Sequence, residues 1–259
     1  MRARAPSDSF TNAGGTNTGQ AIGASGWYYN NVRVDGVVGI NTNYARSGNG
    51  SAYMRTQAVA APGTTNSKAD IEFLPNASAN SNGNWITGGS LGLFSQFTGM
   101  FYEWYRDSAS TNSAVQHPSL RVLVATTAGL SGLVFERAYN SGGAAPTDAW
   151  VSDVIDGSSK LWSFGALGFA SGGYGVTLDD WKADSRLADA VVVGFSSGVG
   201  SGWGEFIGAV DNIGWTIGGQ TVSYNFEVNR NAVPEPGSLA LAGLSLAALA
   251  AARRRRQTR

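Results

Sequence analysis

Short runs of β-branched and aromatic residues alternate with clusters of glycine, serine and asparagine along most of this chain. Glycine accounts for 36 of the 259 residues, about twice its ordinary share, and no long helical period lies between the clusters. Such clusters are typical of turns. Apolar runs of strand length lie between them, at 27–40, 69–74, 98–106, 120–126, 132–137, 150–155, 190–195, 204–210 and 222–228. The alternation predicts an all-β fold, an antiparallel β-sandwich with two sheets in jelly-roll order.

The body of the chain is predicted to be one domain over residues 7–230, because no linker divides it. Hydrophobic residues make up 42% of the chain, which is enough to fill a core. One short helix is expected. Thr177 and Asp180 have the spacing of a capping box, and Trp181 would anchor a helix that runs to about Leu187 and closes one end of the sandwich.

The reactive side chains are few. Cysteine is absent, which excludes disulfides, thiol catalysis, iron–sulfur clusters and cysteine-based zinc sites. His117 is the only histidine, it precedes Pro118 in a polar loop, and no G-x-S-x-G elbow exists that would supply a nucleophile for it. We therefore expect His117 to be a turn residue or a hydrogen-bonding group at the entry to a strand.

Charge is distributed unevenly although the formal net charge is zero. Seven of the 18 basic residues lie at the two ends, which leaves 11 basic and 18 acidic residues within residues 8–236. An acidic, lysine-poor body is not typical of a nucleic-acid-binding protein, so no nucleic acid is expected among the partners.

The C-terminal segment, residues 233–259, has a composition of its own. Pro234, Glu235 and Pro236 present an acidic side chain on extended backbone. A single hydrophobic helix is predicted after them, with four arginines at its end, which is typical of a membrane insertion whose basic side stays in the cytoplasm. The apolar run of 14 residues would span about 21 Å, less than a hydrocarbon core of roughly 30 Å. The leucines of this predicted membrane segment are Leu239, Leu241, Leu244, Leu246 and Leu249, and the basic anchor is Arg253, Arg254, Arg255 and Arg256.

This tail resembles a PEP-CTERM sorting signal in its Pro-Glu-Pro motif, spacer, leucine/alanine helix and arginine cluster. The resemblance implies that an exosortase, a membrane-embedded processing enzyme, cuts near the motif during export. It also implies a Gram-negative host that makes exopolysaccharide and biofilm matrix, and a final location at the cell surface or in that matrix. Residues 1–6 are then interpreted as the remnant of an export signal, since Ala3-Arg4-Ala5 fits the A-x-A pattern of a signal-peptidase site.

The body also resembles β-sandwich ectodomains that are found ahead of such tails. The segments that carry this likeness are SGNGSAYM, KADIEFL, FYEWYRDSAST, HPSLRVLV and GAVDNIGWTIGGQTVSYNFEV. Those ectodomains have no assigned activity, so the likeness supports the sandwich and implies no chemistry.

Two pairs of carboxylates are candidates for glycoside hydrolysis, which needs two such groups about 5–10 Å apart. Asp70 and Glu72 point to one side of a predicted strand, and Glu103 and Asp107 do the same on another. The E-x-D-x-x-E pattern of laminarinase-like sandwich hydrolases is missing. We therefore expect solvated strand carboxylates, paired with Arg106 or Arg121, and no enzyme.

Two binding sites remain as hypotheses. Trp27, Tyr28 and Trp203 lie beside turns, where aromatic faces could stack on sugar rings, although most tryptophans are expected in the core. Asp211, next to Asn212, is a candidate ligand for a structural calcium ion. The favoured alternative is an Asx turn that joins the last two strands, so no cofactor is expected apart from that candidate calcium.

Three functions are compatible with these features. The first is an exported, non-enzymatic surface or matrix protein that binds exopolysaccharide. The second is a secreted glycan-active enzyme on a sandwich fold. The third is a structural or adhesive subunit without affinity for glycans. Retention on the host polysaccharide separates the first from the third, and a cleft with two convergent carboxylates is required for the second.

Overall fold

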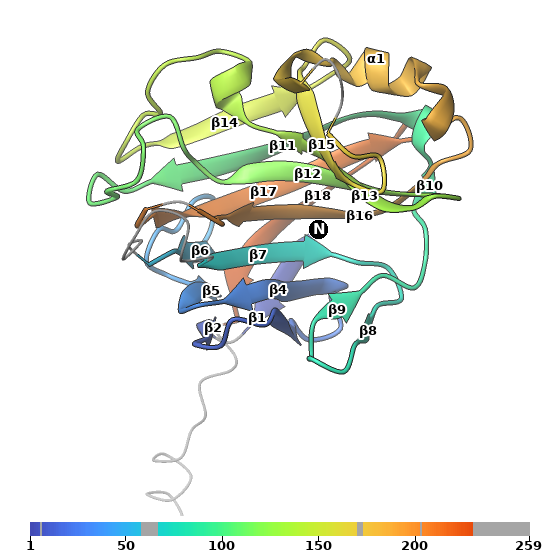
Figure 1. The fold of residues 1–259 in the computed structure, drawn as a ribbon. Coiled ribbons are helices and arrows are strands. Elements are labelled where there is room, and N and C mark those ends of the chain that lie inside the picture. The colour runs from blue at the N-terminus through green and yellow to red at the C-terminus, as the bar shows by residue number, and fades with distance from the viewer. Residues whose placement is uncertain (6, 58–66, 170–172, 203, 230–259) are drawn as a thin grey trace, which may run out of the picture. The chain divides into compact units, whose positions relative to one another are not determined.

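The computed structural model describes residues 1–5, 7–57, 67–169, 173–202 and 204–229 (Figure 1). Met1–Val228 forms one compact unit. It is mostly β, with several sheets and one short α-helix, which confirms the predicted fold class at this level. Nearly all strand pairings are antiparallel, and the chain passes repeatedly from one large sheet to the other.

The first sheet has eight strands in the order β1-β18-β17-β6-β5-β2, with β11 on β17 and β14 on β11. Strand β17 changes partner along its length, because its first half pairs with β6 and its second half with β18. The strands are β1 (Arg2–Ala5), β2 (Phe10–Asn12), β5 (Gly36–Asn41), β6 (Ser51–Arg55), β11 (Phe97–Arg106), β14 (Trp150–Ile155), β17 (Ile207–Ile217) and β18 (Gln220–Val228).

The second sheet has the order β15-β13-β12-β16-β7-β4-β3, with the short β10 on β16. A separate ribbon pairs β8 with β9. The strands are β3 (Thr18–Ala21), β4 (Trp27–Arg33), β7 (Lys68–Phe73), β8 (Ser78–Ala79), β9 (Trp85–Ile86), β10 (Gly92–Leu93), β12 (Ser119–Thr126), β13 (Gly129–Phe135), β15 (Leu161–Gly165) and β16 (Val191–Val199).

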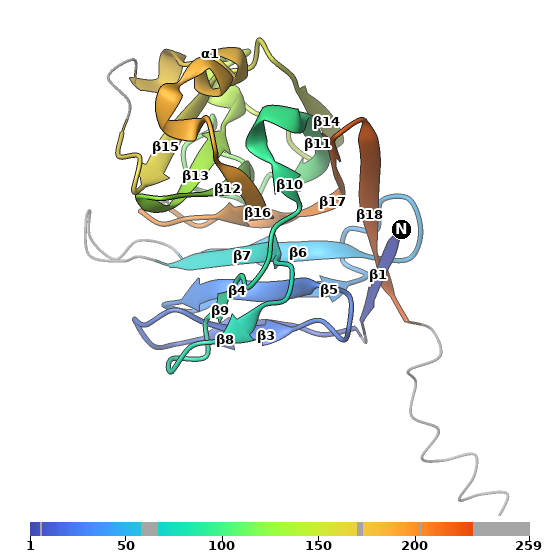
Figure 2. The ribbon, with the colours of Figure 1, turned by 90° about the vertical axis from the view of Figure 1, so that its right-hand side faces the viewer.

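Aromatic side chains hold together the two large sheets, whose strands Figure 2 shows from a second side. Phe195 on β16 stacks on Trp215 of β17 with ring centroids 4.1 Å apart, and Trp27 on β4 meets Phe226 of β18 at 4.9 Å. All four side chains are buried. Because alternate residues of a strand face opposite sides, burying one set places the neighbouring residues on the outer faces of the sandwich.

The predicted capping box is present. Thr177 Oγ1 accepts the Asp180 N–H at 3.1 Å, and an Asp180 carboxylate oxygen accepts the Thr177 N–H at 3.0 Å. Helix α1 (Leu178–Ala183) is shorter than predicted, and a separate 3₁₀ turn covers Ser185–Leu187. The buried Trp181 donates its indole N–H to Leu161 O at 2.9 Å, which holds α1 against edge strand β15. The other 3₁₀ turns are Phe94–Gln96, Arg137–Tyr139 and Gly173–Gly175.

The N-terminal residues belong to the folded unit. Residues 2–5 form β1, which pairs in parallel with the end of β18, and Ala3 and Ala5 are buried. Hence the boundary at residue 7 is too late, since the predicted remnant 1–6 contains a strand of the sandwich.

The C-terminal tail lies outside the described residues. This includes Pro234, Glu235 and Pro236 and the whole of the predicted membrane segment and basic anchor. Among the residues that are described, no helix has the length and apolar character needed to cross a membrane.

Candidate functional site

A line of side chains crosses the outer face of the second sheet. The strand register places six residues next to one another from β4 to β15. Their neighbours along each strand point into the core. The six residues, in order across the sheet, are Tyr28, Glu72, Ser196, Arg121, Val134 and Trp162. Residues from six strands therefore share one surface.

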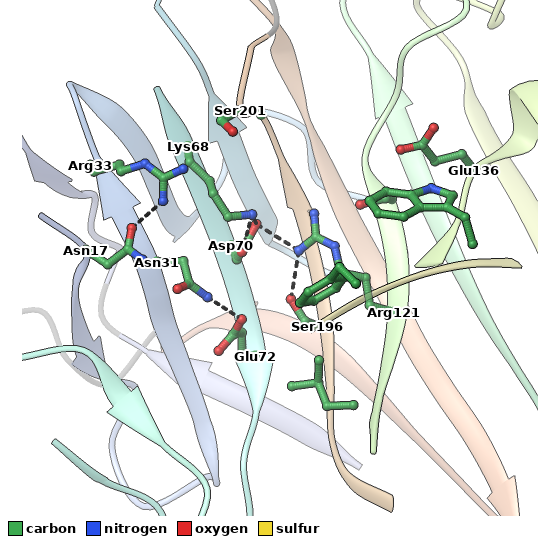
Figure 3. A pocket seen from close by; sticks show the side chains of 15 residues that line it. Asn17, Asn31, Arg33, Lys68, Asp70, Glu72, Arg121, Glu136, Ser196 and Ser201 are labelled. Atoms are coloured by element: carbon green, nitrogen blue, oxygen red, sulfur yellow. Dashed lines mark hydrogen bonds and ion pairs between the residues drawn. The ribbon is translucent and has the colours of Figure 1, made fainter. Parts of the chain in front are cut away.

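This surface is hollowed into a furrow of about 390 Å³ (Figure 3). It is lined by charged, amide and hydroxyl groups over its floor and by aromatic rings at one side. The lining residues used below are Asn31, Lys68, Asp70, Glu72, Arg121, Glu136, Trp162, Phe164 and Ser196. We call this hollow the furrow.

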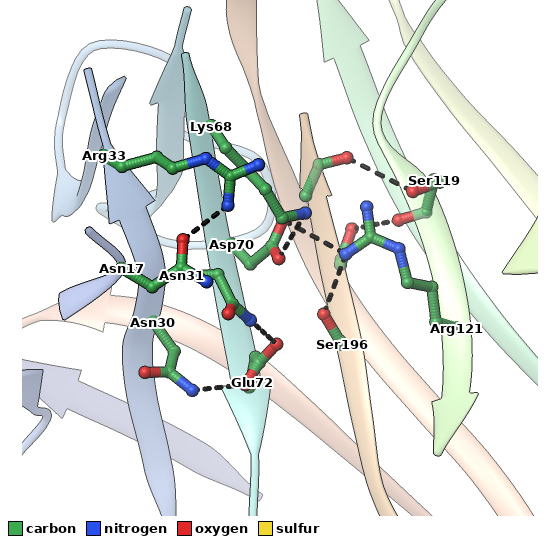
Figure 4. A network of polar contacts seen from close by, with 12 residues as sticks. Asn17, Asn30, Asn31, Arg33, Lys68, Asp70, Glu72, Ser119, Arg121 and Ser196 are labelled. Atoms are coloured by element: carbon green, nitrogen blue, oxygen red, sulfur yellow. Dashed lines mark hydrogen bonds and ion pairs between the residues drawn. The ribbon is translucent and has the colours of Figure 1, made fainter. Parts of the chain in front are cut away.

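Asp70 is the centre of the polar floor (Figure 4). Its two carboxylate oxygens lie 2.9 and 2.7 Å from Lys68 Nζ, and Arg121 Nη1 lies 3.1 Å from one of them. The same guanidinium donates to Ser196 Oγ at 3.0 Å. Asp70 and Arg121 are both buried, with 1% and 7% of their surface exposed. A buried, partnered ion pair of this kind holds its members in fixed positions.

Glu72 is held by two asparagines from β4. Asn30 Nδ2 donates to one carboxylate oxygen at 2.6 Å, and Asn31 Nδ2 donates to the other at 2.7 Å. Consecutive strand residues normally face opposite sides. Here Asn31 has a positive φ of 50° within an irregularity of the β4–β7 pairing, which lets both amides reach one carboxylate.

Burial shifts the pKa values of several groups in this network. Desolvation lowers the pKa of Lys68 to about 8, with Arg121 adding to the effect and Asp70 opposing it. Desolvation, with the neighbouring Asp70 charge, raises the pKa of Glu72. Desolvation also raises the pKa of Glu136, and the positive charge of Arg121 opposes this shift. The furrow therefore holds balanced charges that are partly shielded from water.

Gly198 makes room for the network. It lies opposite Asp70 on β16, and a Cβ at this position would be 1.7 Å from Asp70 Oδ1 and 2.8 Å from Ala69 O. Real Cβ atoms do not approach that closely, so only glycine allows the carboxylate to lie flat against β16.

Aromatic side chains form a patch beside the furrow. Trp162 and Phe164 line the furrow from β15, with ring centroids 6.2 Å apart. Tyr174 contacts Trp162 and stacks on Tyr139 at 4.0 Å, and Phe169 packs on both Trp162 and Tyr174. Phe169 is 56% exposed and Tyr174 44% exposed. We call these five residues the aromatic patch, and it presents an unusual amount of aromatic surface to solvent.

The predicted glycan-contacting residues fare differently. Trp27 is completely buried between the sheets, so its prediction as a glycan-contacting residue is wrong. Its position beside a turn in the sequence did not show that its side chain faces the core. Tyr28 is on the outer face, where it packs on Trp85 at 4.5 Å. Trp203 lies outside the described residues. Sequence reasoning missed Trp162 and Phe164, whose spacing of two on a strand was the available signal.

The two predicted carboxylate pairs lie on different sheets. Asp70 and Glu72 both line the furrow, whereas Glu103 and Asp107 lie on the first sheet, where Arg46 pairs with Glu103 at 2.9 Å and Tyr44 hydrogen-bonds Asp107. The solvated state expected for Asp70 and Glu72 is wrong, because both are buried. The expected pairing with Arg121 is confirmed for Asp70.

His117 is a buried structural residue. Its ring stacks on Trp104 with centroids 4.4 Å apart, and its Nε2 accepts the Arg137 N–H at 3.1 Å. The other ring nitrogen, 2.8 Å from Pro118 O, then carries the proton and donates it. Burial lowers the pKa of His117 to about 4. His117 is therefore a neutral residue whose two ring nitrogens both make hydrogen bonds within the fold. This agrees with its predicted hydrogen-bonding role.

Asp211 lies inside β17 and is fully buried. The predicted Asx turn between the last strands is wrong, since that turn is formed by Gly218 and Gly219. One Asp211 oxygen accepts the N–H groups of Phe226 and Asn212, each at 2.8 Å, and the other has no hydrogen-bond partner. In the described part of the chain, no three histidine or acidic side chains are arranged to hold a metal ion. The calcium site stays a prediction.

Comparison with known proteins gives a family match at the C-terminus. Residues 232–256 match the PEP-CTERM protein-sorting motif. No curated protein matches the chain. Among solved structures, the chain is similar to the family 11 carbohydrate-binding module of the cellulosomal cellulase Lic26A-Cel5E of Clostridium thermocellum, at 11% identity and a TM-score of 0.38, over 81% of this chain and 86% of that one. The chain thus carries a PEP-CTERM sorting motif, which implies processing by an exosortase-type membrane enzyme and export to the cell surface.

Proposed function

We propose that this protein is a non-enzymatic, exported glycan-binding protein that holds an exopolysaccharide strand in the furrow. The observation that carries the proposal is the furrow itself, in which the fixed polar groups of Asp70, Glu72 and Arg121 lie beside Trp162 of the aromatic patch. Sugar hydroxyls need donors and acceptors in fixed positions, and sugar rings pack on aromatic faces. A preformed concave surface with both features is a typical ligand site.

The PEP-CTERM motif supports the proposed setting. It implies that the protein is exported and sorted at the membrane before it reaches the cell surface. An exopolysaccharide matrix, as in the biofilm of a Gram-negative bacterium, is the glycan that such a surface protein would meet.

Retention on the polysaccharide of the producing organism tests the proposal. The full chain is placed in lipid nanodiscs at one copy per disc and passed over immobilised exopolysaccharide. We expect the parent to be retained and Trp162→Ala to lose about tenfold in affinity, equivalent to about 1.4 kcal/mol of lost contact. Val154→Ala is the matched control, because Val154 is 72% exposed on β14 and outside the furrow. A parent that is not retained would favour the structural or adhesive subunit.

A glycan-active enzyme is the second candidate, because Asp70 and Glu72 share the furrow and lie two residues apart, about 7 Å along β7. That separation lies within the range used by glycosidases. Both carboxylates are, however, fully engaged by Lys68, Arg121 and two asparagines, which favours binding over catalysis. Release of reducing ends from the polysaccharide by the parent, abolished by Glu72→Gln, would establish the enzyme instead.

A further inference from the structure

The outer face of the first sheet carries a second set of aromatic rings. The register of β6, β17, β11 and β14 places Tyr53, Ala209, Tyr105 and Trp150 side by side. Ala209 is small, and Tyr44 from the loop after β5 stacks on both tyrosines, with ring centroids 6.2 Å from Tyr53 and 4.6 Å from Tyr105. Trp150 continues the series, 5.8 Å from Tyr105. We call Tyr44, Tyr53, Tyr105 and Trp150 the aromatic row; all four are partly exposed.

An open groove of about 470 Å³ continues from the end of this row. Tyr53 belongs to both, so the rings and the groove form one surface. The groove is lined by hydroxyl, amide, carboxylate and guanidinium groups, from Ser7, Asp8, Ser9, Val37, Asn41, Asn43, Tyr53 and Arg55. Such a lining offers donors and acceptors to a ligand rich in hydroxyls.

The charges beside the row are largely neutralised within the protein. Arg55 Nε donates to Glu205 at 2.9 Å, and Arg46 pairs with Glu103 at 2.9 Å. Tyr44 donates its hydroxyl to Asp107. Paired charges and half-buried rings with polar rims suit an uncharged, hydroxyl-bearing ligand better than an apolar protein surface, which would need a larger continuous hydrophobic area.

We propose that the aromatic row and its groove bind a second strand of neutral polysaccharide. The furrow is on the outer face of the second sheet and the row is on the outer face of the first, with the core between them, so the two strands do not compete. The inference goes beyond the proposed function, because one molecule would then bridge two polysaccharide chains and crosslink a matrix.

The test measures binding and bridging separately. The full chain, in nanodiscs at one copy per disc, is mixed with beads that carry the producing organism's exopolysaccharide, and fluorescent exopolysaccharide is added in solution. Binding is the protein retained on the beads, and bridging is the fluorescent polymer captured through it. We expect Tyr53→Ala/Tyr105→Ala to retain bead binding within about threefold while bridging falls about tenfold or more. Trp162→Ala should lower both signals, and Val154→Ala neither.

Two further variants separate ring contact from loss of folding. Tyr44 is in a loop, so Tyr44→Ala should reduce bridging without disturbing strand pairing, and circular dichroism melting checks that the fold is retained. Tyr105→Phe keeps the ring and should keep bridging. Two results would overturn the proposal. One is a parent protein that captures no fluorescent polysaccharide. The other is bridging by Tyr53→Ala/Tyr105→Ala at the parental level, which would mean that two copies of the protein each hold one strand.

Discussion

Asp211 Oδ1 accepts the backbone N–H of Phe226 at 2.8 Å, where β17 leaves β6 and begins to pair with β18. An extra residue on β17 lies opposite β11 at this point, and Asn212 has a positive φ of 48°. The carboxylate thus replaces a strand-to-strand hydrogen bond that the bulge removes. Asp211, predicted as a candidate calcium ligand, therefore contributes to the hydrogen bonding between β17 and β18.

Replacing Asp211 with Asn should change how stability depends on pH. Burial raises the pKa of Asp211 to about 7, against an ordinary value of 3.8. Between these values the unfolded chain ionises and the native chain keeps its proton, so this group lowers stability as pH rises from 4 to 7, on the order of 4 kcal/mol. Asn retains the acceptor oxygen and does not titrate, so Asp211→Asn should be more stable than the parent at pH 7. Urea unfolding at pH 4.5 and 7 measures the difference.

The calcium hypothesis makes a different prediction for the same residue. If Asp211 holds calcium, millimolar Ca²⁺ should raise the melting temperature of the parent by several degrees relative to excess EDTA, and Asp211→Asn should lose that shift. Equal melting temperatures of the parent under the two conditions would remove calcium and leave the hydrogen-bonding role.

His117 should titrate far below an ordinary histidine, near pH 4. The His117 imidazole is protonated below about pH 6.5 in the unfolded chain and only below about pH 4 in the native chain. The free energy of unfolding therefore falls by on the order of 3 kcal/mol as the pH decreases through this window. His117 is the only histidine, so its ring-proton NMR signal can be followed without assignment. A midpoint near 6.5 would show that the ring is not buried against Trp104.

Gly198→Ala should disrupt the floor of the furrow. The added methyl group would overlap Asp70 Oδ1 and force that carboxylate away from Lys68 and Arg121, at a cost of about 3 kcal/mol. Gly15→Ala is the matched control, because a Cβ there meets nothing within 4 Å. Thermal melts of the two variants are compared with the parent, and equal stability would mean that Asp70 is free to move.

Glu235→Ala should leave unprocessed protein in the inner membrane. Glu235 is the only charged residue between Arg230 and Arg253, and it lies within the matched sorting motif. Fractionation and immunoblotting of the producing organism report the size and location of the variant, with Ser238→Ala as a neighbouring control. Release of the variant at the parental rate and size argues against recognition of this carboxylate.

Local signals predicted local structure well. Turn clusters between apolar runs indicated an all-β chain, and Thr177 with Asp180 marked the start of α1, because both patterns depend on residues close in sequence. The sorting motif was found for the same reason. The pairing of Asp70 with Arg121 was among the predicted arginine contacts. The furrow as a whole could not be predicted, since it depends on β7, β12, β15 and β16 lying in register, and no residue near Trp162 in sequence indicates that it shares a surface with Asp70. Contacts between residues remote in sequence also explain why Trp27 was wrongly selected as a surface residue and why residues 2–5 were left outside the predicted domain.

The most direct test of glycan binding in the furrow is chemical-shift mapping by NMR. Oligosaccharides released from the producing organism's exopolysaccharide are titrated into isotope-labelled protein. The account predicts saturable shifts at the Trp162 indole N–H, at the Asn31 amide group and at Ser196, which line the furrow. No shifts at saturating oligosaccharide, or shifts confined to residues remote from the furrow, would contradict it.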